Sequence, residues 1–148
     1  MKAVLQRVRE ASVTVDGHVI GRIDAGLLVF LCAERGDSES QADRMLAKIL
    51  KLRIFADDND KMNRSVQEIA GGLLVVSQFT LAADTSGGNR PGFSSAAAPA
   101  DGQRLYDYFV TGARRVHPLV QTGQFAANMQ VALVNDGPVT IPLRIDPG

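Results

Sequence analysis

Gly71-Gly72-Leu73-Leu74-Val75-Val76-Ser77-Gln78-Phe79-Thr80-Leu81 lies near the middle of the 148-residue sequence, and the rest of the chain can be placed around it. Residues 73–76 form an unbroken apolar run behind a glycine pair, which predicts a central strand covered on both faces. Ser77, Gln78 and Thr80 then place two hydroxyls and an amide at the end of that strand. Buried polar groups must find partners or a ligand, so we expect either a site here or hydroxyls that bond nearby backbone as the strand turns.

Length and composition predict one compact domain over residues 1–148. A chain of this size can bury about 68–70% of its unfolded surface, and 45% hydrophobic with 22% charged residues disfavours disorder. No apolar run approaches the roughly 20 residues of a membrane-spanning helix. Charges interrupt the first ten residues too early for a secretory signal. We therefore expect a cytoplasmic protein that does not enter a membrane.

Charge and side-chain content argue against several classes of function. Sixteen basic and sixteen acidic residues cancel, which disfavours a protein that holds nucleic acid mainly by neutralising many phosphates. Cys32 is the single cysteine, so no internal disulfide or thiolate metal cluster can form, and its apolar surroundings predict a small buried hydrophobe. His18 and His117 lie outside any nucleophile or metal motif, and we expect both to be structural or solvent-facing. Motifs of triad hydrolases, zinc hydrolases and ATPases are missing, and we expect neither a metal nor a cofactor.

The N-terminal third predicts a β-meander. Residues 4–8 and 11–15 are rich in β-branched side chains, and the second segment alternates apolar with polar residues. Asp16-Gly17 is a hairpin signal before residues 18–23. Residues 27–33 then form a second strand without a polar face, which indicates an interior position in the sheet.

Two amphipathic helices are predicted outside the strands. The spacing of Ser38 and Gln41 is that of a capping box at the start of the first helix. The second has Pro99 near its first turn and is stopped by Pro118. Between the helices, residues 53–55 predict a short strand that an exposed turn ends.

The C-terminal third returns to strands. Residues 129–134 alternate, Asn135-Asp136-Gly137-Pro138 predicts a turn, and residues 139–143 predict the returning arm of a hairpin. Pro142 within that arm indicates an edge position or an early end. Residues 82–99 predict an ordered surface loop, and a loop of that length is more often functional than accidental. The element order indicates a mixed α/β domain.

Ser77-Gln78-Phe79-Thr80-Leu81 and Asn135-Asp136-Gly137-Pro138-Val139-Thr140 resemble the two signature motifs of the D-aminoacyl-tRNA deacylase family. Further segments share the resemblance: Gln6-Arg7-Val8, Ala11-Ser12-Val13-Thr14-Val15, Arg53-Ile54-Phe55, Lys61-Met62-Asn63, Arg90-Pro91, Tyr106-Asp107-Tyr108-Phe109 and Met129-Gln130-Val131. Asn128 and Gly92 stand where family members often have aspartate and serine. The resemblance implies a single-domain three-layer sandwich of two β-sheets with helices packed on one side, acting as a homodimer.

The same resemblance implies hydrolysis of the ester bond that joins a D-amino acid to the 3′-terminal adenosine of a tRNA. Such an ester is already reactive, so positioning and fixed N–H donors can suffice without a strong side-chain base. We expect backbone N–H groups around Phe79 and Thr80 to contact the oxyanion, and Gln78 and Thr80 to position the ester or a water. The resemblance implies that the 2′-hydroxyl of the adenosine assists the water. It leaves open whether the Thr80 hydroxyl is a nucleophile, and it places Ser77 among the substrate contacts.

Selectivity is implied for the Gly137-Pro138 pair. In the family its peptide bond is cis and reaches into the active site of the other subunit, where two carbonyls would obstruct an L side chain. Glycine has no side chain to reject, so glycyl-tRNA, including glycine mischarged on tRNA-Ala, should also be hydrolysed. Arg7 matches an arginine that braces this loop. Met129 matches a methionine of the adenine pocket, although its spacing fits core packing equally well.

Two other functions remain compatible with the residues. A general small-ester hydrolase would use Thr80 or Ser77 as its nucleophile. A non-catalytic dimeric module would bind RNA ends without turnover. Arg90 and Phe93, in the long loop, are further candidates for contact with the substrate.

Overall fold

Strand β6 (Gly72–Ser77) is the central strand that the apolar run predicts. It pairs in parallel with β3 (Gly26–Cys32) on one side and with β7 (Val120–Thr122) on the other. In this computed structural model, which describes residues 1–147, every residue of β6 except Ser77 is buried. A strand with neighbours on both edges and cover on both faces has no place for polar side chains until it ends.

Strand β1 (Lys2–Val15) joins the parts of the sheet. One edge of β1 pairs along its length with β8 (Gln130–Arg144). The other edge pairs first with β3 and then with β2 (His18–Ile23). The two N-terminal segments of the meander are therefore one continuous strand in a six-stranded sheet of order β2-β1-β3-β6-β7, with β8 beside β1.

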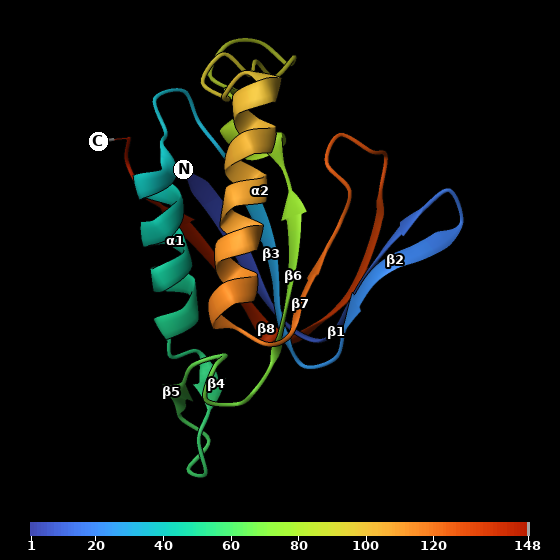
Figure 1. Cartoon of the computed structure of the whole chain (residues 1–148), viewed down its shortest axis with the longest axis vertical. Helices are drawn as coiled ribbons and strands as arrows, with labels where there is room; N and C mark the ends of the chain where they lie inside the picture. The colour runs from blue at the N-terminus through green and yellow to red at the C-terminus, as the bar shows by residue number, and fades with distance from the viewer. Residues whose placement is uncertain (148) are drawn as a thin grey trace.

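Helices α1 (Glu39–Lys51) and α2 (Pro99–Val116) cover the same face of this sheet (Figure 1). Both predicted starts are confirmed: the Gln41 side chain accepts the Ser38 N–H at 2.7 Å, and Pro99 is the first residue of α2. The core between the helices and the sheet is built from apolar side chains of α1, α2, β1, β3 and β6, among them Met45, Ile49, Leu105, Phe109, Leu5, Leu27, Val29, Leu73 and Val75.

A second apolar cluster lies on the opposite face, where β2 and the end of β1 curl over β3 and β6. Val8, Ala11 and Val13 pack there with side chains of β3 and β6, among them Leu28, Leu74 and Val76. The result is helices, sheet and curled sheet in three layers, and the predicted mixed α/β fold with helices on one side is confirmed. A separate two-stranded sheet pairs β4 (Phe55–Ala56) with β5 (Met62–Arg64). The expected strand at residues 53–55 therefore starts only at Phe55.

The predicted C-terminal hairpin is wrong. Residues 130–144 form the single strand β8, both halves of which pair with β1. Gln6 lies opposite Thr140 and Val8 opposite Asn135, so residues 136–139 bulge out opposite Arg7 alone. A turn-forming sequence makes a wide bulge here because β1 continues past it and offers partners on both sides.

After β6 the chain enters a short 3₁₀ helix, η1 (Phe79–Ala82), and the loop expected over residues 82–99 follows it to α2. The loop is tied across its base by two hydrogen bonds between the backbones of Asp84 and Gly92, at 2.8 and 2.9 Å. None of the helices in the described part of the chain has the length and hydrophobicity needed to cross a bilayer.

Candidate functional site

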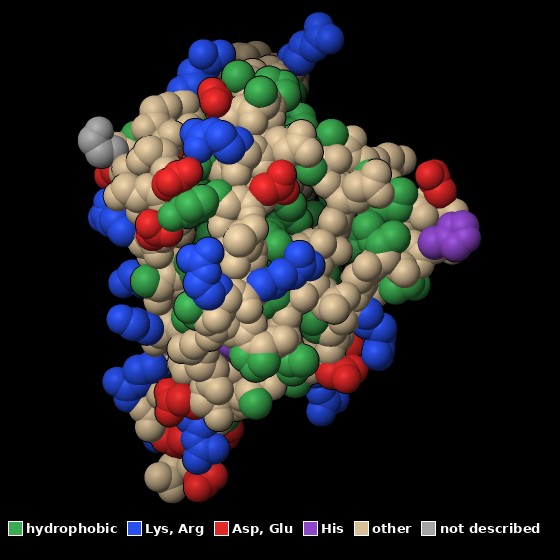
Figure 2. Space-filling view, in the orientation of Figure 1, with side chains coloured by type: hydrophobic (Ala, Val, Ile, Leu, Met, Phe, Trp, Pro, Cys, Tyr) green, Lys and Arg blue, Asp and Glu red, His purple; other side chains and the backbone are tan. Residues whose placement is uncertain are grey.

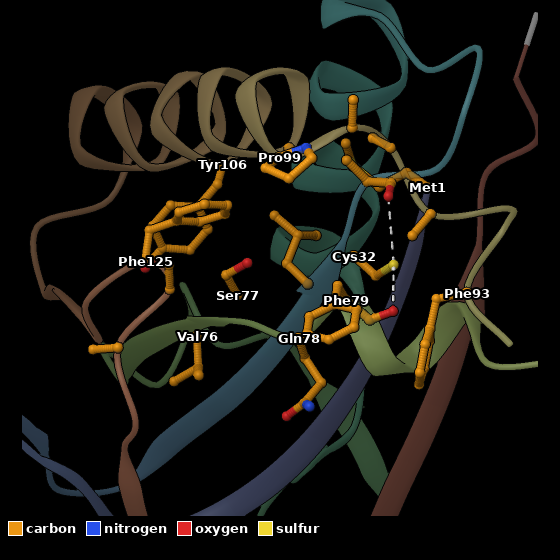
Figure 3. Close-up of a pocket in the computed structure, with 18 of the residues that line it drawn as sticks. Met1, Cys32, Val76, Ser77, Gln78, Phe79, Phe93, Pro99, Tyr106 and Phe125 are labelled. Carbon is orange, nitrogen blue, oxygen red and sulfur yellow. Dashed lines mark hydrogen bonds between the residues drawn. The ribbon is translucent and has the colours of Figure 1, made fainter. Parts of the chain in front are cut away.

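A cavity of about 670 Å³ opens where β6 ends. Ser77, Gln78 and Phe79 form its floor, with Tyr106 and Phe125 on one side and Phe93 on the other (Figure 3). Most of its other lining residues are apolar and come from the end of β3, the segment that leads into α2, and the segment that leads into β8. An apolar cavity with a few convergent polar groups is the usual form of a small-molecule site.

The backbone at the strand end leaves two donors without a partner. The Gln78 N–H donates to Leu31 O at 2.8 Å, and the Leu81 N–H donates back to Gln78 O at 3.2 Å. Among residues 1–147, the N–H groups of Phe79 and Thr80 between them have no acceptor. Adjacent free N–H groups can stabilise a negative oxygen.

The side chains at this point form a small polar group at the cavity rim. Gln78 Nε2 donates to Thr80 Oγ1. Phe79 is 58% exposed, and its ring meets Phe93 edge to face with centroids 5.1 Å apart. Thr80 is exposed and lies beside the cavity rather than in its lining. The structure therefore brings the predicted residues Ser77, Gln78, Phe79 and Met129 together around one cavity, with Thr80 joined to them through Gln78.

The inner wall contains residues that sequence reasoning did not assign to a site. The Tyr106 hydroxyl donates to Val75 O at 2.7 Å, and burial raises the pKa of Tyr106 to about 12, so the phenol stays neutral. The Phe125 ring lies 6.1 Å from the Tyr106 ring. A Cβ at Gly123 would come within 2.7 Å of Met129 Sδ, so glycine leaves the space that Met129 occupies. Tyr106 lies on the buried apolar face of α2, where helical spacing alone does not distinguish a cavity wall from core packing.

Cys32 is among the residues that line the cavity. Its Sγ is 3.6 Å from Phe79 O (Figure 3), and the residue is 2% exposed. Burial, with a smaller contribution from the charge of Glu34, raises the pKa of the Cys32 thiol to about 11. The group therefore remains a neutral thiol near pH 7, and its prediction as a small buried hydrophobe is confirmed.

A second group of predicted residues lies in the β8 bulge. Arg7 Nε donates to Asp136 O at 2.9 Å, and Arg7 Nη1 donates to Ile54 O at 2.7 Å. Asn135 Oδ1 accepts the Val139 N–H at 2.9 Å, which closes the bulge. The Gly137–Pro138 peptide bond within it is cis, and both residues are exposed. The expected contact of Arg7 with this loop is present.

Gln6 is a further residue that sequence reasoning left without a role. Its Oε1 accepts hydrogen bonds from Asn135 Nδ2 at 2.6 Å and from Thr140 Oγ1 at 2.5 Å, so it ties both ends of the bulge to β1. A glutamine in an alternating strand gives no local sign of this contact, because its partners are more than a hundred residues away along the chain.

The structure does not bring Gly137 and Pro138 to the cavity of their own chain. Neither residue is among those that line it, whereas Met129 and Val131 of the same C-terminal region are. The two signature motifs thus lie apart within one described chain.

Both histidines lie outside the cavity. His117 is buried, with Nε2 2.7 Å from Gly71 O, and His18 is exposed at the start of β2. No cluster of three or more His, Cys, Asp or Glu side chains that could hold a metal ion occurs within residues 1–147.

Comparisons with known proteins identify the family and the fold. The family model described as D-Tyr-tRNA(Tyr) deacylase matches residues 4–144. A D-aminoacyl-tRNA deacylase of Aromatoleum aromaticum is 70% identical over 147 residues, which cover 99% of this chain and 97% of the relative. A solved structure titled c-Myc DNA Unwinding Element Binding Protein is 40% identical, with a TM-score of 0.95 over 99% of both chains.

A probable eukaryotic D-amino acid tRNA deacylase shares the fold at lower sequence identity. Its TM-score is 0.81 at 18% identity, and the match covers 97% of this chain and 98% of the other. The match of the family model over nearly the whole sequence, with a relative at 70% identity, settles the classification. The chain belongs to the D-Tyr-tRNA(Tyr) deacylase family of hydrolases.

Proposed function

We propose that this protein hydrolyses the ester bond of D-aminoacyl-tRNA in the cytoplasm, releasing the D-amino acid and free tRNA. The observation that carries the proposal is the pair of unpartnered N–H groups, Phe79 and Thr80, at the rim of an apolar cavity. Family membership supports the substrate, since the relative at 70% identity is named for this activity.

The cavity would hold the 3′-terminal adenosine. Its aromatic and thioether walls, Phe125, Tyr106 and Met129, suit a flat nucleobase, and the half-buried Ser77 hydroxyl can bond a polar edge of the nucleoside. Seating the adenosine there places its ribose near Gln78 and Thr80, so the ester would lie against the free N–H groups.

Hydrolysis would begin when water adds to the ester carbonyl carbon. Negative charge then develops on the carbonyl oxygen, where the Phe79 and Thr80 N–H groups can stabilise it. Gln78 and Thr80 side chains hold the ester or the water, and the 2′-hydroxyl of the adenosine assists the water. The carbonyl then reforms, and the bond to the ribose 3′-oxygen breaks as that oxygen takes up a proton.

Selectivity would come from a second copy of the chain. We propose a homodimer in which the main-chain carbonyls at Gly137 and Pro138 of one subunit enter the cavity of the other and obstruct an L side chain. Three observations support this: the bulge is exposed, it is braced by Arg7 and Asn135, and it lies away from its own cavity. Glycyl-tRNA, including glycine mischarged on tRNA-Ala, would pass the obstruction.

The deciding experiment compares matched esters under single-turnover conditions with a chelator present. D-tyrosyl-tRNA and glycyl-tRNA should be hydrolysed, L-tyrosyl-tRNA should persist, and a terminal 2′-deoxyadenosine should slow cleavage. Cleavage of the L ester at the D rate would end the selectivity proposal. Cleavage of simple aryl esters at a similar rate would instead indicate a general esterase, and binding of a non-hydrolysable analogue without any turnover would indicate a binding module.

The role of Thr80 is tested by the same assay. Thr80→Val keeps the shape of the side chain and the backbone N–H but removes the hydroxyl. If Thr80→Val and Thr80→Ala both keep the wild-type rate, the hydroxyl has no part in the reaction and only the backbone donors remain.

A further inference from the structure

Arg35 lies at the rim of the cavity. It is exposed, and among residues 1–147 it is the one Lys, Arg, Asp or Glu that lines the cavity. The remaining lining is apolar or uncharged, apart from the terminal amine of Met1, which is buried against Asp37. A single exposed cation at the mouth of a neutral cavity is a candidate for contact with a negative group of the substrate.

Two segments hold Arg35 in place. Its N–H donates to Ser95 O at 2.9 Å, and Nε donates to Ser94 O at 2.6 Å. The neighbouring residue Glu34 forms a β-bridge with Ala96. The guanidinium is therefore held through Nε, and among residues 1–147 its two terminal nitrogens form no hydrogen bond of their own.

Among residues 1–147, no carboxylate neutralises those terminal nitrogens. Within the described part of the chain Arg35 forms no ion pair. The nearest acids in sequence are engaged elsewhere: Glu34 lies 3.4 Å from the Met1 amine and 3.9 Å from Lys2 Nζ, and Asp37 accepts the Glu34 N–H at 2.7 Å. Within the described residues, the terminal nitrogens of Arg35 at the rim thus have neither a carboxylate nor another acceptor.

A nucleotide seated in the cavity must carry its 5′ phosphate out past the rim. A guanidinium fork binds phosphate oxygens in a bidentate manner, more tightly than a neutral donor does. We propose that Arg35 binds the phosphate on the 5′ side of the terminal adenosine. This inference rests on the proposed function and adds to it the contact that fixes the nucleotide chain.

A single arginine–phosphate contact is consistent with the absence of net charge on this protein. Lys and Arg side chains are interspersed with Asp and Glu on the face shown in Figure 2, and the chain carries no net charge. A broad phosphate-binding surface is therefore not available on this face, and a single well-placed arginine can supply local grip without binding the tRNA body.

The test uses two substrates that differ by one phosphate: 3′-O-(D-tyrosyl)adenosine and the same compound with a 5′-phosphate. Wild-type protein should hydrolyse the phosphorylated compound with a KM about tenfold lower, because a charge-assisted contact is gained. Arg35→Gln should lose that advantage and leave the KM of the unphosphorylated compound unchanged. Arg35→Lys should restore part of it, and kcat should stay the same in all three, since the contact is equal in the ground and transition states.

Arg115→Gln is the matched control, because Arg115 is an exposed arginine in the last turn of α2, far along the helix from the residues that line the cavity. It should behave as wild type with both compounds. With D-tyrosyl-tRNA, Arg35→Gln should reduce the slope of log KM against log salt concentration by about 0.7, the value for one phosphate of a single strand.

The outcomes separate this inference from the proposed function. If Arg35→Gln weakens both compounds equally, Arg35 shapes the cavity and binds no phosphate. If it changes neither compound, the contact does not exist. If wild-type protein cleaves neither compound nor D-tyrosyl-tRNA, the proposed function is wrong, and the inference that depends on it is rejected as well.

Discussion

Arg7 joins two segments that are distant in the sequence. One side of its guanidinium bonds the bulge at Asp136 O, and the other bonds Ile54 O at the end of the segment after α1. The side chain is only 15% exposed. Its bond to Ile54 O is partly buried, whereas its bond to Asp136 O lies at the surface. An arginine in an alternating strand would ordinarily be a solvent-facing charge. Arg7 instead braces the bulge, because it is the one residue of β1 that lies opposite residues 136–139.

Replacing Arg7 by alanine should therefore affect stability and selectivity together. Losing two charge-assisted hydrogen bonds should lower the free energy of unfolding by about 2–3 kcal/mol in urea titrations. With the bulge less restrained, the ratio of D-tyrosyl to L-tyrosyl ester cleavage should fall. Arg9→Ala is the control, because Arg9 is exposed and forms no ion pair within residues 1–147. A variant that loses stability but keeps the ratio would show that Arg7 does not govern the bulge.

Individual site residues were predictable where polarity broke a pattern. Ser77 and Gln78 stand out because they end an apolar strand, and the structure places both in the cavity lining. Tyr106 and Phe125 gave no such sign, because an aromatic side chain facing a cavity and one facing the core have the same periodicity. Arg35 was missed for a related reason: an exposed arginine in a connecting segment looks like ordinary surface charge.

At the level of elements, β3 and β6 approach each other through glycine. An ideal Cβ at Gly26 would lie 2.0 Å from Gly72 O, a backbone atom that cannot turn aside. These two glycines begin the parallel pair at Gly26↔Gly72, so the register of the pair starts at a point where only hydrogen fits. Of the glycine pair ahead of the apolar run, Gly72 is thus part of the sheet, whereas Gly71 lies just before it.

Gly26→Ala should disrupt this pairing. The overlap with backbone should cost about 3 kcal/mol or more of unfolding free energy, or prevent folding. Gly72→Ala should cost less, because its Cβ would meet a side chain, with Ile23 Cγ2 at 2.8 Å. Gly92→Ala has nothing within 4 Å and should stay within about 0.5 kcal/mol of wild type. Equal stability of all three variants in thermal or urea unfolding would contradict the close approach.

The helices, whose starts depend on neighbouring residues in the sequence, were predicted correctly. The pairing of the C-terminal strand was not. The capping box at Ser38 and the proline at the start of α2 depend on neighbours in sequence, and both helices begin as expected. The bulge in β8 uses the same residue types as a hairpin turn, so local chemistry alone favoured the hairpin. What decides between them is β1, more than a hundred residues earlier in the chain, which pairs with both halves of β8.

For the whole molecule, the free edge of β8 bears on the proposed homodimer. Within the described chain, β8 pairs only with β1, and Leu133 and Val134 are exposed by 38% and 46%. Leu133 lies opposite the inward-facing Ala11, so it continues the face that carries Val131 toward the cavity. A partner subunit that inserts its bulge into the cavity would pack against this face and bury Leu133.

Leu133→Glu should therefore separate the subunits. A desolvated charge at the centre of an interface should raise the dimer dissociation constant by about a hundredfold, measured by sedimentation or light scattering. Activity per chain should fall on dilution, and the D-to-L ratio should change with it. Val116→Glu, a similar change at a 52% exposed residue at the end of α2, is the control and should leave assembly unchanged. A monomeric wild-type protein with full selectivity would reject the shared site.

The bulge differs from a hairpin tip in how it is tethered. A tip is joined to the sheet at its base alone and can sway, whereas residues 136–139 are flanked on both sides by paired strand and fastened at Gln6 and Arg7. Its mobility should accordingly follow that of the sheet itself. On heating, the ratio of D-tyrosyl to L-tyrosyl ester cleavage should therefore stay nearly constant until the whole protein unfolds. Selectivity and folded structure should then be lost at the same temperature.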